Sequence, residues 1–298
     1  MKLPKITEVE ARGILNPVRQ PDDWFGLKYN MNLYRGCQHR CIYCDSRSEC
    51  YQIEDFDGEV LVKANAVELL AGLLPRKRVR GTIGTGSMND PYMPLEKQYH
   101  LTGRALAVIA ENRFPVHVLT KSDLVLKDLE TLTEISTVFA AVSFTVTAAS
   151  DELGKKVEPG APPVSRRFAA MARLAGRGIH TGVLLMPVLP LIEDQPENIL
   201  AIVRLAAEHG AEYLLPSFGM TIRDRQRDYY YRQLDRHFPG LKEQYIRKFG
   251  GNYFAPAENA ERLSELTAEA CEKVGISLSM PKFTPEPVVR KSPQMKLF

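Results

Sequence analysis

The sequence predicts an α/β fold, a partial (β/α)6 barrel of the TIM type with an appended C-terminal helical region. Two patterns predict it. Short apolar runs rich in β-branched residues alternate with amphipathic stretches, and polar residues follow most of those runs. Alternating strands and helices are typical of a parallel sheet covered by helices. The six units indicate an open barrel, because a closed TIM barrel has eight.

The expected strands are short and largely apolar, as buried parallel strands are. They span Leu27–Leu33, Gly81–Thr85, Val116–Thr120, Val138–Val146, His180–Met186 and Glu212–Phe218. The stretches between them carry apolar residues at helical spacing. The expected helices span Ala64–Leu74, Thr102–Asn112, Lys127–Ile135, Ser165–Arg177 and Pro196–His209. Ser165 is the expected N-cap of its helix, and Gly178 and Gly210 follow helix ends.

Three parts are expected along the chain. Residues 1–25 form an N-terminal extension, residues 26–220 the partial barrel and residues 221–298 the C-terminal helical region. After Gly219 the sequence becomes basic, aromatic and helical in pattern. One more amphipathic helix is expected near Ala257–Val274.

Composition restricts the class of protein. The 298 residues are 44% hydrophobic and 25% charged with a net charge of +3, which favours a folded protein without a strong global field for nucleic acid or membranes. The longest apolar stretch, Gly182–Ile192, is short and broken by prolines, so no membrane-spanning segment is expected. The N-terminus lacks an apolar signal region, and we therefore expect a cytoplasmic protein.

The cysteines are the most informative part of the composition. There are five, an odd number, and three of them fall within eight residues. This argues against a secreted disulfide protein and for a reducing compartment. Cys271 lies in an amphipathic helical pattern and is expected in the core. Cys50 follows the clustered cysteines closely and is either a free loop thiol or an accessory ligand.

The clustered cysteines are Cys37, Cys41 and Cys44, separated by three and then two residues. Three thiolates on one short loop can each hold one iron of a cubane cluster and leave the fourth iron open for substrate chemistry. A zinc site completed by Cys50 or His39 is the alternative, although structural zinc usually uses separated cysteine pairs. The polar residues around these thiols fit poorly with cysteines that are only buried.

Polar residues also collect where four expected strands end. Arg35–Cys44 follows the first strand, Ser87–Asp90 the second and Lys121–Ser122 the third, while Ser143 and Thr145 lie at the end of the fourth. Carboxyl ends of parallel strands share one edge of the sheet. The four loops are therefore expected to point into one cleft, with both hydroxyls of the fourth strand on the same face.

The cysteine spacing, with Tyr43 directly before the last cysteine and the loop at the end of the first strand, resembles the radical S-adenosylmethionine superfamily. Within it, the chain is similar to the spore photoproduct lyase-like branch, also called DNA repair photolyase-like. The resemblance covers most of the chain. It rests on the segments Gly36–Cys44, Ser87–Glu96, Leu119–Ser122, Val142–Thr145, Glu158–Pro159 and Pro187–Pro190.

This resemblance implies a [4Fe–4S] cluster on Cys37, Cys41 and Cys44, with S-adenosylmethionine bound to the fourth iron through its amino and carboxylate groups. An external one-electron reductant would drive cleavage to methionine and a 5′-deoxyadenosyl radical, which abstracts hydrogen from an unidentified substrate. In such enzymes the cofactor carries the difficult chemistry, and the protein orients it and keeps water out.

The resemblance also implies which residues contact the cofactor. The candidates are Tyr43, Ser87, Asn89, Asp90, Lys121, Ser143 and Thr145. Asn89 and Asp90 match positions near the methionyl amine, and Lys121 suits the methionyl carboxylate. Tyr43 is expected near the adenine. The two hydroxyls of the fourth strand are expected at the ribose or methionyl groups, with Glu158 as a weaker candidate for a ribose hydroxyl.

Two positions depart from the lyases of this branch. Those lyases return hydrogen to the product radical from a cysteine, and the matching residue here is Ser87. They also carry a tyrosine directly after the last cluster cysteine, where this chain has Asp45. An O–H bond is far stronger than an S–H bond, so serine cannot replace the cysteine as hydrogen donor. Cys50 is close in sequence, and its functional substitution for that cysteine stays open beside a free loop thiol or an accessory ligand. We therefore expect the mechanism of the superfamily without the lyase reaction.

Two basic clusters raise the question of a nucleic-acid substrate. Basic residues interleaved with aromatic ones suit phosphate contacts and base stacking. The clusters are Arg76, Lys77, Arg78 and Arg80, and Arg223, Arg225, Arg227, Arg232 and Arg236 around Tyr229–Tyr231. Aspartates interrupt the second cluster, which fits a solvated helix face equally well. A peptide, protein or small-molecule substrate stays open, as does the oligomeric state.

The competing functional hypothesis is a zinc-containing nucleic-acid-binding protein without radical chemistry, in which the thiols are structural and the basic tail binds the partner. A third hypothesis is a cluster protein that uses S-adenosylmethionine only for methyl or electron transfer. Metal analysis separates the zinc hypothesis from the other two, and product analysis separates the radical hypothesis from methyl transfer.

Overall fold

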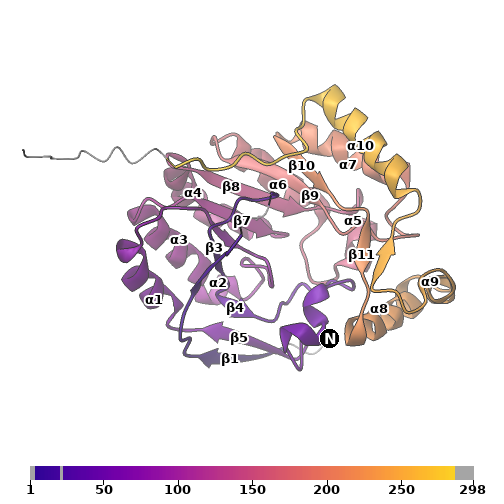
Figure 1. Cartoon of the computed structure of the whole chain (residues 1–298), viewed down its shortest axis with the longest axis horizontal. Coiled ribbons are helices and arrows are strands. Elements are labelled where there is room, and N and C mark those ends of the chain that lie inside the picture. Colours follow the sequence, from indigo (N-terminus) through magenta and orange to yellow (C-terminus); the bar gives the residue numbers. More distant parts are fainter. Residues whose placement is uncertain (1–3, 21–22, 286–298) are drawn as a thin grey trace, which may run out of the picture.

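The computed structural model describes residues 4–20 and 23–285. Among these residues the main sheet has seven strands in the order β10-β9-β8-β7-β6-β3-β2 (Figure 1). They are β2 (Leu15–Pro17), β3 (Tyr29–Met31), β6 (Ile83–Thr85), β7 (Val116–Thr120), β8 (Ala140–Thr145), β9 (His180–Leu185) and β10 (Tyr213–Pro216). All neighbours are parallel except β2 with β3. This confirms the predicted parallel strands and the partial barrel.

The predicted helices between the strands are confirmed within a few residues at each end. They are α1 (Ala66–Leu73), α3 (Leu101–Glu111), α4 (Leu129–Ser136), α6 (Val164–Ala175) and α7 (Pro196–Glu208). Two short helices, α2 (Glu96–Tyr99) and α5 (Asp151–Val157), were not predicted. Short 3₁₀ helices lie at η1 (Asp45–Arg47), η2 (Glu49–Tyr51), η3 (Leu74–Arg76) and η4 (Asp123–Asp128).

The predicted start of α6 was wrong, whereas the predicted helix ends hold. Pro163 occupies the N-cap position, and the Ser165 hydroxyl lies within the first turn and donates to Asp151 Oδ2 at 2.7 Å. Proline suits this boundary because the first N–H groups of a helix have no intrahelical acceptor. Gly178 and Gly210 have φ angles of +72° and +79°, the left-handed conformation in which glycine ends helices.

Strand β8 shows how the sheet divides its side chains between two layers. Val142 and Phe144 pack in the main core between the sheet and the helices, and each contributes on the order of 2 kcal/mol by burial. Ala141, on the opposite face, packs in the barrel interior. Because side chains alternate along a strand, Ser143 and Thr145 share this inner face, as predicted.

A small sheet lies beside the barrel and supports the cysteine loop. It contains β1 (Lys5–Val9), β5 (Glu59–Lys63) and β4 (Tyr34–Arg35), in that order. Strand β4 leads into the loop through Gly36, whose φ is +89° and whose absent Cβ would lie 2.6 Å from the Glu59 carbonyl oxygen. Only glycine fits this turn without strain. The N-terminal strands β1 and β2 were not predicted, and the predicted domain boundaries stay a prediction.

The C-terminal region combines a two-stranded antiparallel sheet with three helices. Strands β11 (Gly219–Thr221) and β12 (Phe254–Pro256) flank α8 (Asp224–His237) and α9 (Leu241–Phe249), and α10 (Ala260–Val274) follows. Figure 1 shows α10 against α7 and places α8 and α9 beside the barrel. The predicted core position of Cys271 is confirmed, since it is buried in the main cluster. Within the described residues, no helix has the length and apolar character needed to cross a membrane.

Candidate functional site

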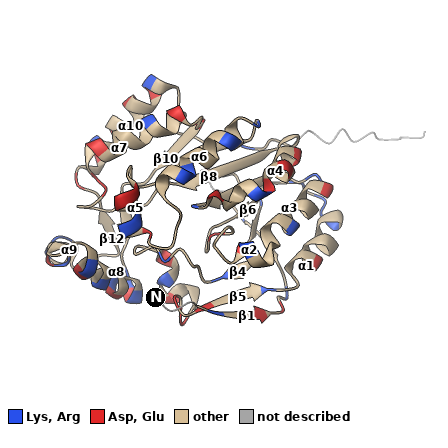
Figure 2. Cartoon of the chain, turned by 180° about the vertical axis from the view of Figure 1, so that it is seen from behind, with Lys and Arg blue, Asp and Glu red and all other residues tan. Residues whose placement is uncertain are grey.

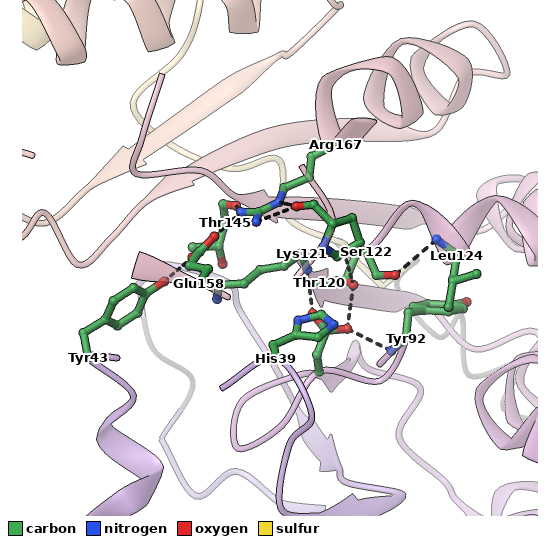
Figure 3. Close-up of polar contacts among 12 residues, drawn as sticks. His39, Tyr43, Tyr92, Thr120, Lys121, Ser122, Leu124, Thr145, Glu158 and Arg167 are labelled. Carbon is green, nitrogen blue, oxygen red and sulfur yellow. Dashed lines mark hydrogen bonds and ion pairs between the residues drawn. The ribbon is translucent and has the colours of Figure 1, made fainter. Parts of the chain in front are cut away.

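Several chain segments meet at the carboxyl edge of the main sheet. The cysteine loop follows β4, the loop after β6 carries Asp90, β7 ends next to Lys121, and Glu158 follows α5. Figure 3 shows Lys121 pointing toward Glu158, with Tyr43 and Arg167 on either side of that carboxylate. The parallel direction of the strands brings these ends together.

The three clustered thiols lie close to one another. Cys37, Cys41 and Cys44 form no disulfide. Burial raises the pKa of all three, that of Cys37 to about 12, and the neighbouring thiols further raise the pKa of Cys37 and Cys41 electrostatically. Among the described residues, no three His, Cys, Asp or Glu side chains converge closely enough to hold a single metal ion. Three neighbouring thiols on one loop could each hold a separate iron of a cluster.

Asp90 fastens the loop after β6 to the end of β7. Its Oδ1 accepts hydrogen bonds from the Tyr92 amide at 2.8 Å and the Thr120 hydroxyl at 2.7 Å. Its Oδ2 accepts from the Lys121 amide at 2.6 Å. A carboxylate has about four acceptor positions. These three donors fix its orientation and leave capacity for one more.

Glu158 is the centre of a buried charged cluster. It accepts a hydrogen bond from the Tyr43 hydroxyl and lies 2.5 Å from Arg167 Nη1 and 3.9 Å from Lys121 Nζ. Burial alone raises the pKa of Glu158, but Arg167 and Lys121 outweigh it and the net pKa is lowered. Burial lowers the pKa of Lys121, yet Cys41 and Glu158 raise it overall. Two cations facing one carboxylate leave positive charge beside the cysteine loop, where an anionic group can bind.

Two buried polar side chains at this edge lack hydrogen-bond partners. Asn89 Nδ2 and both ring nitrogens of His39 make no hydrogen bond to the described residues, although the two residues are only 6% and 1% exposed. Burial lowers the pKa of His39, so the ring is neutral at neutral pH, with its Nδ1 3.3 Å from Asp90 Oδ2. An unsatisfied buried polar group costs about 1–3 kcal/mol. Such groups fit a site that a polar ligand completes, so the residues present are compatible with a bound cofactor.

The remaining candidates are not all brought to this cluster. Ser87 is exposed, and its hydroxyl exchanges hydrogen bonds with the Asn30 side chain at 2.9 and 3.2 Å. Ser143 is fully buried, and its hydroxyl lies 2.8 Å from His117 Nε2 and 2.7 Å from the Tyr213 hydroxyl. Thr145 lies at the end of β8, and its carbonyl accepts a hydrogen bond from Arg167 Nη1 at 3.0 Å.

Arg167 is a site residue that sequence reasoning missed. It is 1% exposed, and in addition to its ion pair it donates to the Pro162 carbonyl at 3.1 and 2.9 Å. It lies on the buried face of α6 together with Val164, Phe168 and Met171. An arginine in the apolar period of a helix was the available signal, because a buried arginine needs a buried partner.

The basic run at the start of α8 is also turned inward. Arg223 pairs with Asp45, and Arg225 and Arg227 donate to backbone carbonyls of the chain itself. Tyr230 is fully buried. Figure 2 shows Lys and Arg along α8 and α9, but these three arginines have internal partners. This part of the second basic cluster therefore serves packing rather than a free phosphate-binding surface.

Comparison with known proteins assigns the family. The radical SAM superfamily matches residues 31–206. An uncharacterized protein of Mycobacterium tuberculosis is 30% identical over 83% of this chain and 74% of that protein. An uncharacterized protein of Methanocaldococcus jannaschii is 33% identical over 64% of this chain and 70% of its own length. The chain belongs to the radical SAM superfamily, whose members bind a [4Fe–4S] cluster and S-adenosylmethionine.

Solved structures support the fold. Spore photoproduct lyase complexed with dinucleoside spore photoproduct matches with a TM-score of 0.68 at 16% identity, over 91% of this chain and 81% of the lyase. A lyase mutant with bound AdoMet matches equally well at 14% identity, over 91% of this chain and 81% of that one, again with a TM-score of 0.68. At this identity the likeness shows a shared fold. The predicted fold class is confirmed, and the chain is an enzyme of the radical SAM superfamily.

Proposed function

We propose that this chain reductively cleaves S-adenosylmethionine at a [4Fe–4S] cluster held by Cys37, Cys41 and Cys44 and abstracts hydrogen from an unidentified substrate. The observation that carries the proposal is the position of three neighbouring free thiols beside the charged cluster at the carboxyl edge of the sheet. When bound, the two cofactors supply a 5′-deoxyadenosyl radical. The electron comes from an external reductant.

The chain's own residues bind and orient the nucleotide part of this site. Lys121, whose side chain is 17% exposed, presents its ammonium group to the methionyl carboxylate. Asn89 and Asp90 face the methionyl amine, and Asp90 has the acceptor capacity for it. Tyr43, whose ring centroid lies 5.8 Å from Lys121 Nζ, belongs on the adenine side. Glu158 is the partner we assign to a ribose hydroxyl.

The three hydroxyl residues among the predicted cofactor contacts lie at different places in the barrel. Thr145 lies at the strand end and suits a ribose or methionyl contact. Ser143 has internal partners in the barrel, and Ser87 lies at the exposed end of β6 beside Asn30. Their contacts with the cofactor stay predictions.

The reaction differs from that of the lyases in how the product radical ends. Ser87 stands where those lyases have their hydrogen-donating cysteine, and Asp45 where they have a tyrosine. Neither a serine hydroxyl nor a carboxylate donates a hydrogen atom readily. We infer a reaction in which the product radical receives its hydrogen from another donor or receives none.

A relative from Pseudomonas phage M6 is named a radical SAM Nalpha-GlyT isomerase. It is 25% identical to this chain, and the match covers 57% of this chain and 35% of the relative.

A nucleic-acid partner stays a prediction, because the first basic cluster does not lie beside the cysteine loop. The exposed cluster of residues 76–80 directly precedes β6 and so lies at the amino edge of the sheet, away from the cysteine loop. Nucleic acid bound there would not reach the thiols without spanning the barrel. Binding to a DNA column at increasing salt tests this surface separately from the chemistry. Retention should be lost when Arg76, Lys77, Arg78 and Arg80 are replaced by glutamine.

The free cysteines support a cytoplasmic location.

Anaerobic reconstitution with iron and sulfide tests the proposed function. The wild-type chain should bind iron and sulfide and, with dithionite and S-adenosylmethionine, form 5′-deoxyadenosine. The Cys37→Ala, Cys41→Ala, Cys44→Ala triple variant should form none, whereas Cys50→Ser, a matched loss of one exposed thiol, should retain the iron. Stoichiometric zinc without sulfide would support the zinc-binding hypothesis instead. S-adenosylhomocysteine as product would support methyl transfer.

A further inference from the structure

The segment that follows the last clustered cysteine is hydrogen-bonded to residues at the start of α8. Asp45 comes directly after Cys44 and opens the 3₁₀ helix η1. Both of its carboxylate oxygens accept hydrogen bonds from Arg223, through Nε at 3.1 Å and Nη2 at 2.6 Å. Bidentate pairing of this kind fixes geometry as well as charge.

Two further donors complete the carboxylate. The Thr221 hydroxyl donates to Asp45 Oδ1 at 2.8 Å, and the Tyr51 hydroxyl to Oδ2 at 3.0 Å. With Arg223 these donors fill the four acceptor positions of Asp45. The side chains of Asp45 and Arg223 are only 34% and 19% exposed, so water screens the pair less than it screens a surface pair. Asp45 is therefore committed to holding strand β11 and helix α8 against the cysteine loop.

Contacts on both sides of Asp45 repeat this arrangement. The Gln226 amide donates to the Tyr43 carbonyl at 3.2 Å, one residue before Cys44. Arg225 Nε donates to the Arg47 carbonyl at 2.7 Å, three residues after it. The Arg47 guanidinium in turn lies 3.5 Å from the ring centroid of Tyr229 on α8. The backbone around the last cysteine is thus fixed by residues about 180 positions later in the chain.

We propose that Asp45 and Arg223 are positioning residues that set the orientation of Cys44 in the cluster site, so that the C-terminal region is part of the cluster-binding machinery. The proposal rests on the proposed function for the cluster itself. Removing a group that hydrogen-bonds to and orients a metal ligand typically lowers the metal affinity about 10–100-fold. The departure from the tyrosine of the lyases at position 45 then has a physical reason, because a carboxylate is the partner that a half-buried guanidinium favours.

The test compares Asp45→Asn and Arg223→Gln with wild type in the full-length, cluster-loaded chain. Asparagine keeps the shape of Asp45 and removes its charge. Each variant should lose iron to a chelator roughly tenfold faster, and the EPR spectrum of its reduced cluster should change. Arg223→Lys keeps the charge and loses the bidentate geometry, so its iron loss should fall between wild type and Arg223→Gln.

The matched control is Arg177→Gln. Arg177 also makes a bidentate pair, with Glu130 at 2.8 and 2.6 Å, but between α4 and the end of α6, far along the chain from the cysteines. Its iron loss and EPR spectrum should equal those of wild type. Wild-type iron loss and an unchanged spectrum in both Asp45→Asn and Arg223→Gln would overturn the proposal, even if those variants melt at a lower temperature.

A measurement on the cluster-free chain keeps this proposal separate from the proposed function. Amide hydrogen exchange of residues 44–53 should be roughly tenfold faster in Asp45→Asn than in wild type if α8 holds this segment. Unchanged exchange contradicts the contact. A wild-type chain that takes up no cluster, combined with faster exchange in the variant, would refute the proposed function and leave the contact established.

Discussion

Both ends of the barrel interior contain buried polar residues, but the two ends differ in whether these residues have hydrogen-bond partners. At the deeper end, the hydroxyls of Ser143 and Tyr213 and the ring of His117 bond to one another, within an apolar layer closed by Phe139 and Met280. At the carboxyl end, charged side chains meet and buried groups of Asn89 and His39 lack hydrogen-bond partners in the described chain. The first network has its hydrogen bonds within the chain, whereas the second has buried polar groups free to bond a ligand. We therefore expect the first network to stabilise the fold and the second to bind the cofactor.

The largest effect is expected from substitutions of the clustered cysteines at the carboxyl end. Replacing Cys37, Cys41 or Cys44 singly with alanine should abolish 5′-deoxyadenosine formation, because in the proposed site each thiolate would hold one iron and a cluster with two protein ligands is labile. Product quantification by liquid chromatography measures this. The circular dichroism spectrum should stay that of the wild type. Activity retained in any of the three would remove that cysteine from the ligand set.

Lys121 tests the charge at the same end. Lys121→Met removes the ammonium group while keeping the length of the side chain, and should weaken S-adenosylmethionine binding about tenfold, the worth of one charge-assisted hydrogen bond. Isothermal titration of the anaerobic protein measures the affinity. Lys156→Met, which breaks only a surface pair with Glu152, is the control and should bind as the wild type does. Equal affinities for both variants would exclude Lys121 from the methionyl carboxylate.

Glu193 gives the carboxyl end a pH dependence. It is fully buried in the loop after β9, where it accepts hydrogen bonds from Thr147 and the Leu189 amide and faces the charges of Glu158 and Asp194. Burial raises its pKa from 4.5 to about 8. Because the folded pKa lies above the unfolded one, Glu193 contributes stability that is complete below pH 4.5 and is lost as pH rises through about 8.

Glu193→Gln should remove this dependence. Denaturant unfolding of wild type and variant across that pH range should show a difference in unfolding free energy that shifts in favour of the variant by a few kcal/mol as the pH rises. The difference is the informative quantity, since groups such as Glu158 titrate in both proteins. A difference that does not change with pH would mean that Glu193 is ionised in the folded chain.

Substitution of Ser143 at the deeper end is expected to have the smallest effect on cofactor binding. Ser143→Ala leaves His117 and Tyr213 without their shared partner and should lower the unfolding free energy by about 1–3 kcal/mol. If Ser143 belongs to the deeper network alone, S-adenosylmethionine affinity stays at the wild-type value. A loss of affinity as large as that of Lys121→Met would instead assign Ser143 to the cofactor, as the sequence alone predicts.

The sequence predicts the elements better than the contacts between them. Strand Val116–Thr120 has the same bounds in the structure, because its continuous apolar run has one stable place in a parallel sheet. The basic and aromatic run at Arg223–Tyr231 reads equally well as a nucleic-acid surface or as packing. Its partners, Asp45 and the carbonyls around it, lie about 180 residues earlier, and local patterns contain no information on such pairings.

The candidate site divides in the same way. The clustered cysteines are visible because their spacing is local, and Asp90 and Lys121 because they follow strands. Of the ion pair between Glu158 and Arg167, only Glu158 was predicted from the sequence as a site residue. Arg167 was missed because its burial, which requires the ion pair, cannot be read from a helical pattern alone. The boundaries between the barrel and its flanking regions cannot be derived from hydropathy alone, because β1 and β12 join sheets with strands that are distant in sequence.

The most direct test of the central claim is the EPR spectrum of the dithionite-reduced, reconstituted protein before and after addition of S-adenosylmethionine. We expect the signal of a reduced [4Fe–4S] cluster and a change in its g-values on addition, because three cysteine ligands on one loop would leave one iron open beside Lys121 and Asn89. A cluster signal that S-adenosylmethionine leaves unchanged, or a protein that holds zinc and no sulfide, would contradict it.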